Sequence, residues 1–176
     1  MIQSKVELEN WYANDNDPWA YDKSTDDLRR KEILLREIPK GEYEYVLDIG
    51  CGNGFITKNL PGKVITGIDI SENVIKTAKD LNQNNSVQYL QKNIFDLYNH
   101  SNKYDLIIIT GVLYPQYIGN SSNLIHLIID KILNSKGILL TVHIEEWYKS
   151  RFPFNFIKEQ IYSYHNYLHK LEVYQK

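Results

Sequence analysis

The sequence predicts an α/β fold: one seven-stranded, mostly parallel sheet with helices on both faces and an antiparallel hairpin at its end. Two observations predict the parallel part. Apolar runs of strand length alternate with helical patterns, and a glycine-rich turn follows the first run. A third observation predicts the hairpin. The last two strand patterns are joined by His165, Asn166 and Tyr167, too short a connection for a crossover helix.

The helices are predicted from their caps and from apolar residues that recur on one face. Ser24 begins a capping-box pattern, and Pro39 ends a helix of about four turns. Ser71 is placed to cap a second helix, in which Val74 and Ala78 share a face. A short helix is expected at 55–60, and an apolar one runs from Ser121 or Ser122 through Leu133.

The strands are predicted from short apolar runs between these helices. The run 106–109 is apolar throughout, which is typical of a central parallel strand that is buried on both faces. Gly137 provides the turn into the fifth strand. In chain order, the expected strands are 43–49, 64–70, 87–90, 106–109, 138–143, 156–164 and 168–174.

Length and composition favour a single domain over residues 1–176, because 176 residues with 43% hydrophobic content can bury a full core. The net charge of -2 and the lack of any run of five Lys/Arg argue against a nucleic-acid partner. Cys51 is the only cysteine, so neither an intramolecular disulfide nor a cysteine-built zinc site is expected.

The N-terminal residues lack the apolar segment of a signal peptide, and no apolar stretch approaches membrane-spanning length. We therefore expect a soluble, cytoplasmic protein without a membrane partner. No metal site is expected either.

The glycine-rich turn is the most informative segment. Gly50, Gly52 and Gly54 follow an apolar strand that ends in Asp48, and Asp69 ends the next apolar run. Such a turn lets a ligand approach the backbone, while a carboxylate on the neighbouring strand can bind a ribose diol. The spacing G-x-G-x-G, with Phe55 next, differs from the dinucleotide fingerprint G-x-G-x-x-G, and no P-loop lysine follows.

This pattern, Val-Leu-Asp-Ile-Gly-Cys-Gly-Asn-Gly over 46–54, resembles motif I of the S-adenosylmethionine-dependent methyltransferases with a Rossmann-like fold. The resemblance implies S-adenosylmethionine as cofactor. It also implies a cofactor-binding core over residues 41–176, and we expect residues 1–40 to form a helical lid. The expected cofactor-binding residues of the core are Asp48, Gly50, Cys51, Gly52, Asp69, Ile70, Asn93, Ile94, Thr110 and Gly111.

Most of these positions have an expected partner on the cofactor. The turn after the first strand should hold the methionine part, Asp69 the ribose and Ile70 the adenine face. Asn93 matches the family position that accepts from the adenine amino group, and its alternative is a loop asparagine that bonds its own backbone. Thr110 and Gly111 should run beneath the sulfonium.

The N-terminal segment contains Asp17-Pro18-Trp19, followed by Ser24, Asp27 and Arg30. This pattern resembles the nodulation N-methyltransferases, which methylate a glucosamine nitrogen on a chitin-like oligosaccharide. The sequence departs from that pattern at Asp26, where a tyrosine is usual, and at Gly111, where an acidic residue is common. The implied acceptor is an amino sugar or a related glycan nitrogen.

Two residues of this segment are expected at the cofactor. Arg30 can pair with the methionine carboxylate, and Trp19 can close over the sulfonium. The alternatives are a solvated Arg30 in the run Arg29-Arg30-Lys31 and a Trp19 that pins the helix to the core.

Methyl transfer needs a well-placed acceptor, and it needs a base only if the acceptor must lose a proton. His143, at the end of the fifth strand, is the candidate base because an imidazole titrates near neutral pH; a structural histidine is the alternative. Tyr114 can orient the acceptor. We read the other four histidines, His100, His126, His165 and His169, as structural or surface residues.

Three functions remain open from the sequence. The first is a small-molecule methyltransferase that acts at nitrogen, with oxygen as the close alternative. The second is a nucleotide-dependent oxidoreductase, and the third is a catalytically silent S-adenosylmethionine-binding subunit. Because no long insertion separates the fourth and fifth strands, we expect an open pocket that admits a bulky sugar.

Overall fold

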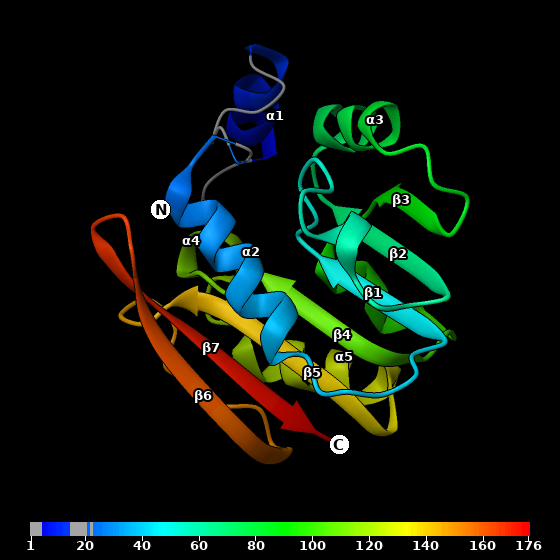
Figure 1. Ribbon diagram of the computed structural model, residues 1–176, viewed down its shortest axis with the longest axis vertical. Coiled ribbons are helices and arrows are strands. Elements are labelled where there is room, and N and C mark those ends of the chain that lie inside the picture. Colours follow the sequence, from blue (N-terminus) through cyan, green and yellow to red (C-terminus); the bar gives the residue numbers. More distant parts are fainter. Residues whose placement is uncertain (1–4, 15–20, 22) are drawn as a thin grey trace.

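The structure is a computed structural model that describes residues 5–14, 21 and 23–176. Its centre is one seven-stranded sheet in the order β3-β2-β1-β4-β5-β7-β6. The first five strands are parallel, and β7 pairs antiparallel with both β5 and β6 (Figure 1). The expected fold class is therefore confirmed. The strands are β1 (Tyr45–Ile49), β2 (Val64–Asp69), β3 (Val87–Gln91), β4 (Tyr104–Thr110), β5 (Leu133–Ile144), β6 (Asn155–Tyr164) and β7 (Tyr167–Gln175).

Helices cover both faces of the sheet. In Figure 1, α2 lies across one face and α5 lies behind the sheet on the other. The Ser24 side chain accepts from the Asp27 amide at the start of α2, and Ser71 accepts from the Val74 amide at the start of α3. Both predicted caps are therefore present. The helices are α1 (Lys5–Asn14), α2 (Thr25–Glu37), α3 (Glu72–Leu81), α4 (Pro115–Ile118) and α5 (Ser122–Ile132), with 3-10 turns η1 (Thr57–Asn59) and η2 (Ile94–Asn99).

Some elements differ from expectation. The helix expected at 55–60 is only the 3-10 turn η1, because Pro61 follows closely and leaves no room for a longer helix. The sequence also gave no prediction of α1 or α4. β5 begins at Leu133, directly where α5 ends, rather than after Gly137.

The core has one layer on each face of the sheet. Along β4, Ile107 and Ile109 pack toward α5, whereas Leu106 and Ile108 pack toward α2. All four are fully buried. This two-sided burial explains why β4 reads as a continuous apolar run.

α1 is held against α3 by one carboxylate. Glu9 accepts hydrogen bonds from the Ser71 hydroxyl at 2.9 Å and from the Glu72 amide at 2.7 Å. These groups form the N-terminus of α3, where unpaired amides and the helix dipole favour an anion. α1 is therefore fixed beside the carboxyl ends of the strands (Figure 1). Within the residues described, no helix has the length and apolarity to span a membrane.

Candidate cofactor and acceptor site

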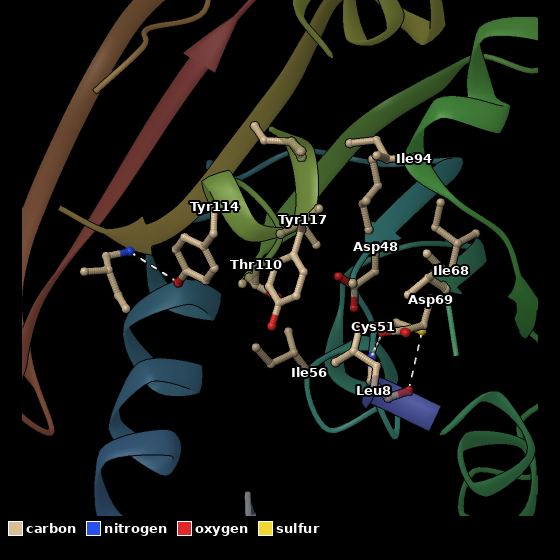
Figure 2. Close-up of a pocket in the computed structure, with 18 of the residues that line it drawn as sticks. Leu8, Asp48, Cys51, Ile56, Ile68, Asp69, Ile94, Thr110, Tyr114 and Tyr117 are labelled. Atoms are coloured by element: carbon tan, nitrogen blue, oxygen red, sulfur yellow. Dashed lines mark hydrogen bonds between the residues drawn. The ribbon is translucent and has the colours of Figure 1, made fainter. Parts of the chain in front are cut away.

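A cavity of about 470 Å³ lies at the carboxyl ends of β1, β2 and β4. The strand order reverses at this edge, because β2 lies on one side of β1 and β4 lies on the other. Open α/β sheets usually bind their ligands at such a point. One part, which we call the glycine-turn half, is bordered by Asp48, Gly50 to Gly52 and Asp69. The other, the hairpin half, is bordered by Arg30, Tyr114, Trp147 and the β6–β7 hairpin. Figure 2 shows several of the lining side chains.

The glycine turn is pressed against neighbouring strand ends. The amides of Gly50 and Cys51 donate to the Ile68 carbonyl at 2.9 and 3.0 Å. Gly50 has a φ of +80°, and a Cβ there would stand 2.7 Å from the Thr110 carbonyl oxygen. Only glycine fits such a position without moving backbone. The turn is therefore locked between β2 and β4.

Asp48 brings a buried carboxylate to the cavity. It is 1% exposed, and its Oδ2 accepts from the Thr57 hydroxyl at 2.6 Å. Its Oδ1 is buried and has no hydrogen-bond partner among the described residues. Burial raises the pKa of Asp48 to about 6, and the Thr57 hydrogen bond opposes that shift. A lining carboxylate with one unsatisfied oxygen is suited to a ligand that carries N–H donors.

Asp69 ties the glycine turn to the end of β2. Its Oδ2 accepts from the Gly52 amide at 3.1 Å, and its Oδ1 accepts from the Ser71 amide at 3.0 Å. Burial raises the pKa of Asp69. Its carboxylate lines the cavity beside Ile70, at the place expected for a ribose-binding group.

Asn93 and Ile94 also line the cavity. Asn93 caps η2, since its Oδ1 accepts from the Phe95 backbone amide at 3.1 Å and its own backbone amide donates to the Asp96 side chain at 2.9 Å. The backbone-bonding alternative is therefore present in the structure. The Asn93 oxygen keeps a second lone pair for another donor.

The segment after β4 leaves space for a ligand. Thr110 and Gly111 line the cavity, and Gly111 has a φ of +68°. A Cβ at Gly111 would meet no atom within 4 Å. The missing side chain thus keeps this part of the cavity open.

Arg30 stands between the two halves of the cavity. It is 8% exposed, and its guanidinium pairs with Asp27 Oδ1 at 2.9 Å. The guanidinium also lies over the rings of Tyr21 and Tyr164, at 5.4 and 5.5 Å from their centroids. The solvated alternative for Arg30 does not fit this burial. Trp19, which was expected over the sulfonium, lies outside the described residues.

Tyr114 begins the hairpin half. Its hydroxyl oxygen accepts from the Ile144 amide at 3.3 Å, a bond drawn in Figure 2. Its ring meets the Trp147 ring edge to face at 5.2 Å. Burial raises the pKa of Tyr114 to about 12, so the hydroxyl keeps its proton.

The structure does not bring His143 to the cavity. Residues 139, 141 and 143 of β5 face α5, and His143 is 0% exposed and meets the Tyr148 ring at 5.0 Å. Burial, followed by the charge of Lys170, lowers the pKa of His143 to about 3. The next residue, Ile144, lines the cavity instead. The strand position of the candidate base was correct, but the side chain points to the opposite face.

Two segments in which the sequence predicted no individual helix or strand also line the cavity. Leu8 and Tyr12 reach it from α1, within the expected N-terminal lid, and Trp147 reaches it from the segment after β5. His165 and His169, expected to be structural or surface residues, also line it. The alternation on β7 carried a signal, because His169 shares its face with Leu171 and Val173. Across the described part of the chain, no cluster of three or more His, Cys, Asp or Glu could hold a metal.

The fold and this cavity define the class of Rossmann-like, S-adenosylmethionine-binding proteins. Residues 41–174 match the family described as "Methyltransferase domain". The chain belongs to this family, and its cofactor is S-adenosylmethionine.

Relatives in this family act on different acceptors. The release factor glutamine methyltransferase of Fusobacterium nucleatum subsp. nucleatum is 39% identical over 82 residues, covering 43% of this chain and 22% of that protein. The malonyl-[acyl-carrier protein] O-methyltransferase of Acetivibrio thermocellus is 26% identical over 143 residues, covering 79% and 49%. The chain thus spans half or less of the length of these curated relatives.

A solved structure shares the whole fold. The N-methyltransferase NodS from Bradyrhizobium japonicum WM9, in complex with S-adenosyl-L-homocysteine, superposes with a TM-score of 0.81 at 22% identity. The match covers 98% of this chain and 97% of NodS. At this identity the likeness describes the fold.

The residues of the glycine-turn half fit the cofactor. The unsatisfied Asp48 Oδ1 suits the ammonium of the methionine part, and the Asp69 carboxylate suits the ribose hydroxyls. The space at Gly111 leaves room for a ligand beside the β4 end. Arg30 carries the positive charge that a methionine carboxylate requires.

Proposed function

We propose that this chain transfers a methyl group from S-adenosylmethionine to a small-molecule acceptor, at the nitrogen of an amino sugar or related glycan. One observation carries the proposal: the cavity continues past the cofactor residues into the hairpin half. A protein that only bound the cofactor would not need this second half. When bound, the cofactor supplies a methyl group that is already activated for transfer.

The walls of the hairpin half suit a sugar ring. Tyr114, Trp147 and Tyr167 form a chain of edge-to-face contacts, each at 5.2 Å between neighbouring centroids. Aromatic faces cover apolar ring surface, and the tyrosine hydroxyls offer hydrogen bonds. Trp147 is 37% exposed and Tyr167 is 42% exposed, so these rings lie at a rim that meets solvent. Such a rim supports the expected open pocket.

The chain's residues divide the work between the two halves. Asp48 and Arg30 hold the charged groups of the methionine part, while the locked glycine turn sets how far the methionine part enters the cavity. Leu8 and Tyr12 of α1 cover the cavity and exclude water. Tyr114 and the aromatic rim hold the acceptor. Bringing donor and acceptor together in this way is the main source of rate in a transfer that needs no covalent enzyme intermediate.

Oxygen is the second candidate acceptor atom. The relative that aligns with 79% of this chain is an O-methyltransferase. The hairpin half offers polar groups that suit a hydroxyl acceptor as well as an amine, so one screen should contain both.

A labelled-methyl screen tests the proposal. The wild-type chain is incubated with S-adenosyl-[methyl-¹⁴C]methionine and with chitosan oligosaccharides, glucosamine, nucleotide sugars, phenols and alkyl amines. We expect transfer to nitrogen in the amino-sugar wells, and no transfer by Asp48→Asn at the same cofactor concentration. Transfer only to hydroxyl acceptors would replace the amino-sugar proposal with O-methylation. Cofactor binding without transfer to any acceptor would favour the silent subunit.

A further inference from the structure

A histidine of the hairpin half has a ring that is fixed in place and nitrogens that no described residue pairs with. We propose that His169 holds the acceptor: its Nε2 accepts a hydrogen bond from the acceptor N–H, which turns the nitrogen lone pair toward the methyl group. This inference rests on the proposed function and names a residue that contacts the acceptor.

The position of His169 follows from the sheet register. His169 of β7 pairs with Ile144, the last residue of β5, and with Tyr162 of β6. Its side chain lies on the α2 face and lines the cavity, with 3% of the residue exposed. The Ile144 amide donates to the Tyr114 hydroxyl. His169 and Tyr114 therefore approach the same strand end, one from β7 and one from the segment after β4.

Aromatic contacts fix the ring. The imidazole stacks on Tyr164 with 3.9 Å between centroids and 15° between planes, and Tyr162 meets it edge-on at 5.7 Å. The Tyr164 hydroxyl in turn donates to Asp27 Oδ1 at 2.8 Å, which anchors the stack to α2. A ring held on both sides cannot turn freely, so its nitrogens keep a constant direction.

Within the described residues, neither nitrogen of His169 has a hydrogen-bond partner. Nδ1 is fully buried, whereas Nε2 is not. Since buried polar groups are normally satisfied, an imidazole with no partner in a cavity wall marks a place where a ligand supplies one. With the hydrogen on Nδ1, the Nε2 lone pair accepts from that ligand.

The charges around His169 favour a neutral acceptor. The groups that surround His169 come from three neighbouring elements and the hairpin turn. They are Arg30 from α2, which is itself paired with Asp27, Tyr162 and Tyr164 from β6, His165 from the hairpin turn, and His143 on the far side of β5. Burial, then the charge of Arg30, lowers the pKa of His169 to about 3. The imidazole therefore stays neutral at physiological pH. The same surroundings disfavour a bound ammonium and favour the neutral amine, the form that has a lone pair.

The transfer balances with a neutral amine. The acceptor nitrogen uses its lone pair to form the N–C bond as the C–S bond breaks, and the electron pair of that bond remains on sulfur. The positive charge passes to the methylated nitrogen, which leaves as an ammonium and exchanges its proton with water. His169 gains and loses no proton in this step, so its task is orientation.

Two substitutions separate the ring from its nitrogens. His169→Phe keeps a ring to stack on Tyr164 and removes both nitrogens, whereas His169→Gln restores a polar side chain. With a chitosan tetrasaccharide as acceptor, we expect His169→Phe to lower kcat/KM about 100-fold, the scale of a misplaced acceptor, and His169→Gln to recover part of it. Affinity for S-adenosylhomocysteine should stay within about twofold. His126→Phe, on α5 and outside the cavity lining, is the matched control.

The outcomes distinguish this inference from the proposed function. If the wild type methylates another acceptor and no amino sugar, the amino-sugar proposal fails, and His169→Phe is judged on that acceptor. If the kcat/KM of His169→Phe stays within about twofold of wild type on every acceptor that the wild type methylates, the assignment of His169 is overturned.

A second measurement does not depend on turnover. In protein loaded with S-adenosylhomocysteine, the imidazole ¹⁵N signals of His169 should move when glucosamine, tyramine or phenol is added, while those of His126 stay in place. If the His169 signals respond to none of these probes, the assignment is wrong whatever the activity screen shows.

Discussion

The two halves of the cavity are built differently from the same sheet. In the glycine-turn half, the ligand-facing groups come from strand ends that are neighbours in the sheet, and backbone geometry at Gly50, Gly52 and Gly111 shapes the space. In the hairpin half, side chains do the shaping. Arg30, Tyr114, Trp147 and His169 come from four separate segments, and their packing against one another sets the walls.

This difference separates what the fold supplies from what the individual sequence supplies. A parallel sheet with this strand order brings the β1, β2 and β4 ends together whatever the surface side chains are. The hairpin half exists only because particular aromatic and polar residues occupy particular faces of α2, β5 and β7. Substitutions in the glycine-turn half should therefore change stability and cofactor binding, and those in the hairpin half should change turnover.

The largest effect is expected at the glycine turn. Gly50→Ala places a Cβ 2.7 Å from the Thr110 carbonyl at a φ of +80°. The new Cβ overlaps with the backbone, and alanine is strained in the left-handed conformation. Together these two effects should lower the free energy of unfolding by about 3 kcal/mol or more. Urea denaturation measures this loss, and calorimetry should show weaker S-adenosylhomocysteine binding.

Gly41→Ala is the matched control, because a Cβ there meets only Tyr43 side-chain atoms at 3.7 Å or more. It should change stability by less than about 0.5 kcal/mol. An equal loss in both variants would mean that the turn is not locked between β2 and β4 as described.

The second effect concerns Asp48 and pH. Its pKa is about 6 in the folded chain and about 3.9 in an unfolded one, so the folded state binds the proton more tightly. The stability of the wild type without cofactor should thus fall as pH rises from about 4 to 6, with no contribution from Asp48 below that range. Asp48→Asn lacks this loss and should be more stable at pH 7 by about 3 kcal/mol.

Cofactor affinity should change in the opposite direction. S-adenosylhomocysteine should bind the wild type more weakly as pH falls below about 6, because protonated Asp48 no longer attracts an ammonium. Asp48→Asn should bind weakly at every pH. Calorimetry from pH 5 to 8 checks both trends, and tight, pH-independent binding by the variant would remove Asp48 from the cofactor site.

The third effect belongs to the hairpin half. Tyr114→Phe removes the oxygen that accepts from the Ile144 amide, and it should cost about 1 kcal/mol of stability. Turnover should fall about tenfold through the lost acceptor contact, with S-adenosylhomocysteine affinity unchanged. If cofactor affinity fell as much as turnover, Tyr114 would belong functionally to the glycine-turn half.

The same division explains what the sequence could predict. The strands, the Ser24 and Ser71 caps and the Asp48 to Gly54 turn are local patterns, because each depends on residues close together in the chain. The hairpin half depends on which face of a strand a residue occupies. On β5 the run Ile138 to Val142 has no clear polar alternation, so nothing local indicated that His143 faces α5.

For α1, the sequence predicted a helical lid over residues 1–40 but neither this helix nor its position. Leu8 and Tyr12 reach the cavity because Glu9 fixes α1 on the N-terminus of α3, more than sixty residues away along the chain. That contact is a tertiary capping interaction between two helices. A local pattern in the first fourteen residues cannot encode it without the position of α3.

The smallest effect is expected at His143, which was predicted as the base only from its position at the end of the fifth strand. His143→Leu replaces a fully buried imidazole by an apolar side chain of similar size, and no described residue forms a hydrogen bond with either nitrogen of that imidazole. Loss of the Tyr148 ring contact destabilises the fold, whereas removal of two unsatisfied polar atoms stabilises it. Because the two effects oppose each other, the free energy of unfolding should change by less than about 1.5 kcal/mol. Turnover should stay within about twofold, because the side chain faces α5 and the cavity lies on the other side of β5. A tenfold fall in turnover at unchanged stability and cofactor affinity would restore His143 as the base, and it would show that the two faces of β5 communicate during the reaction.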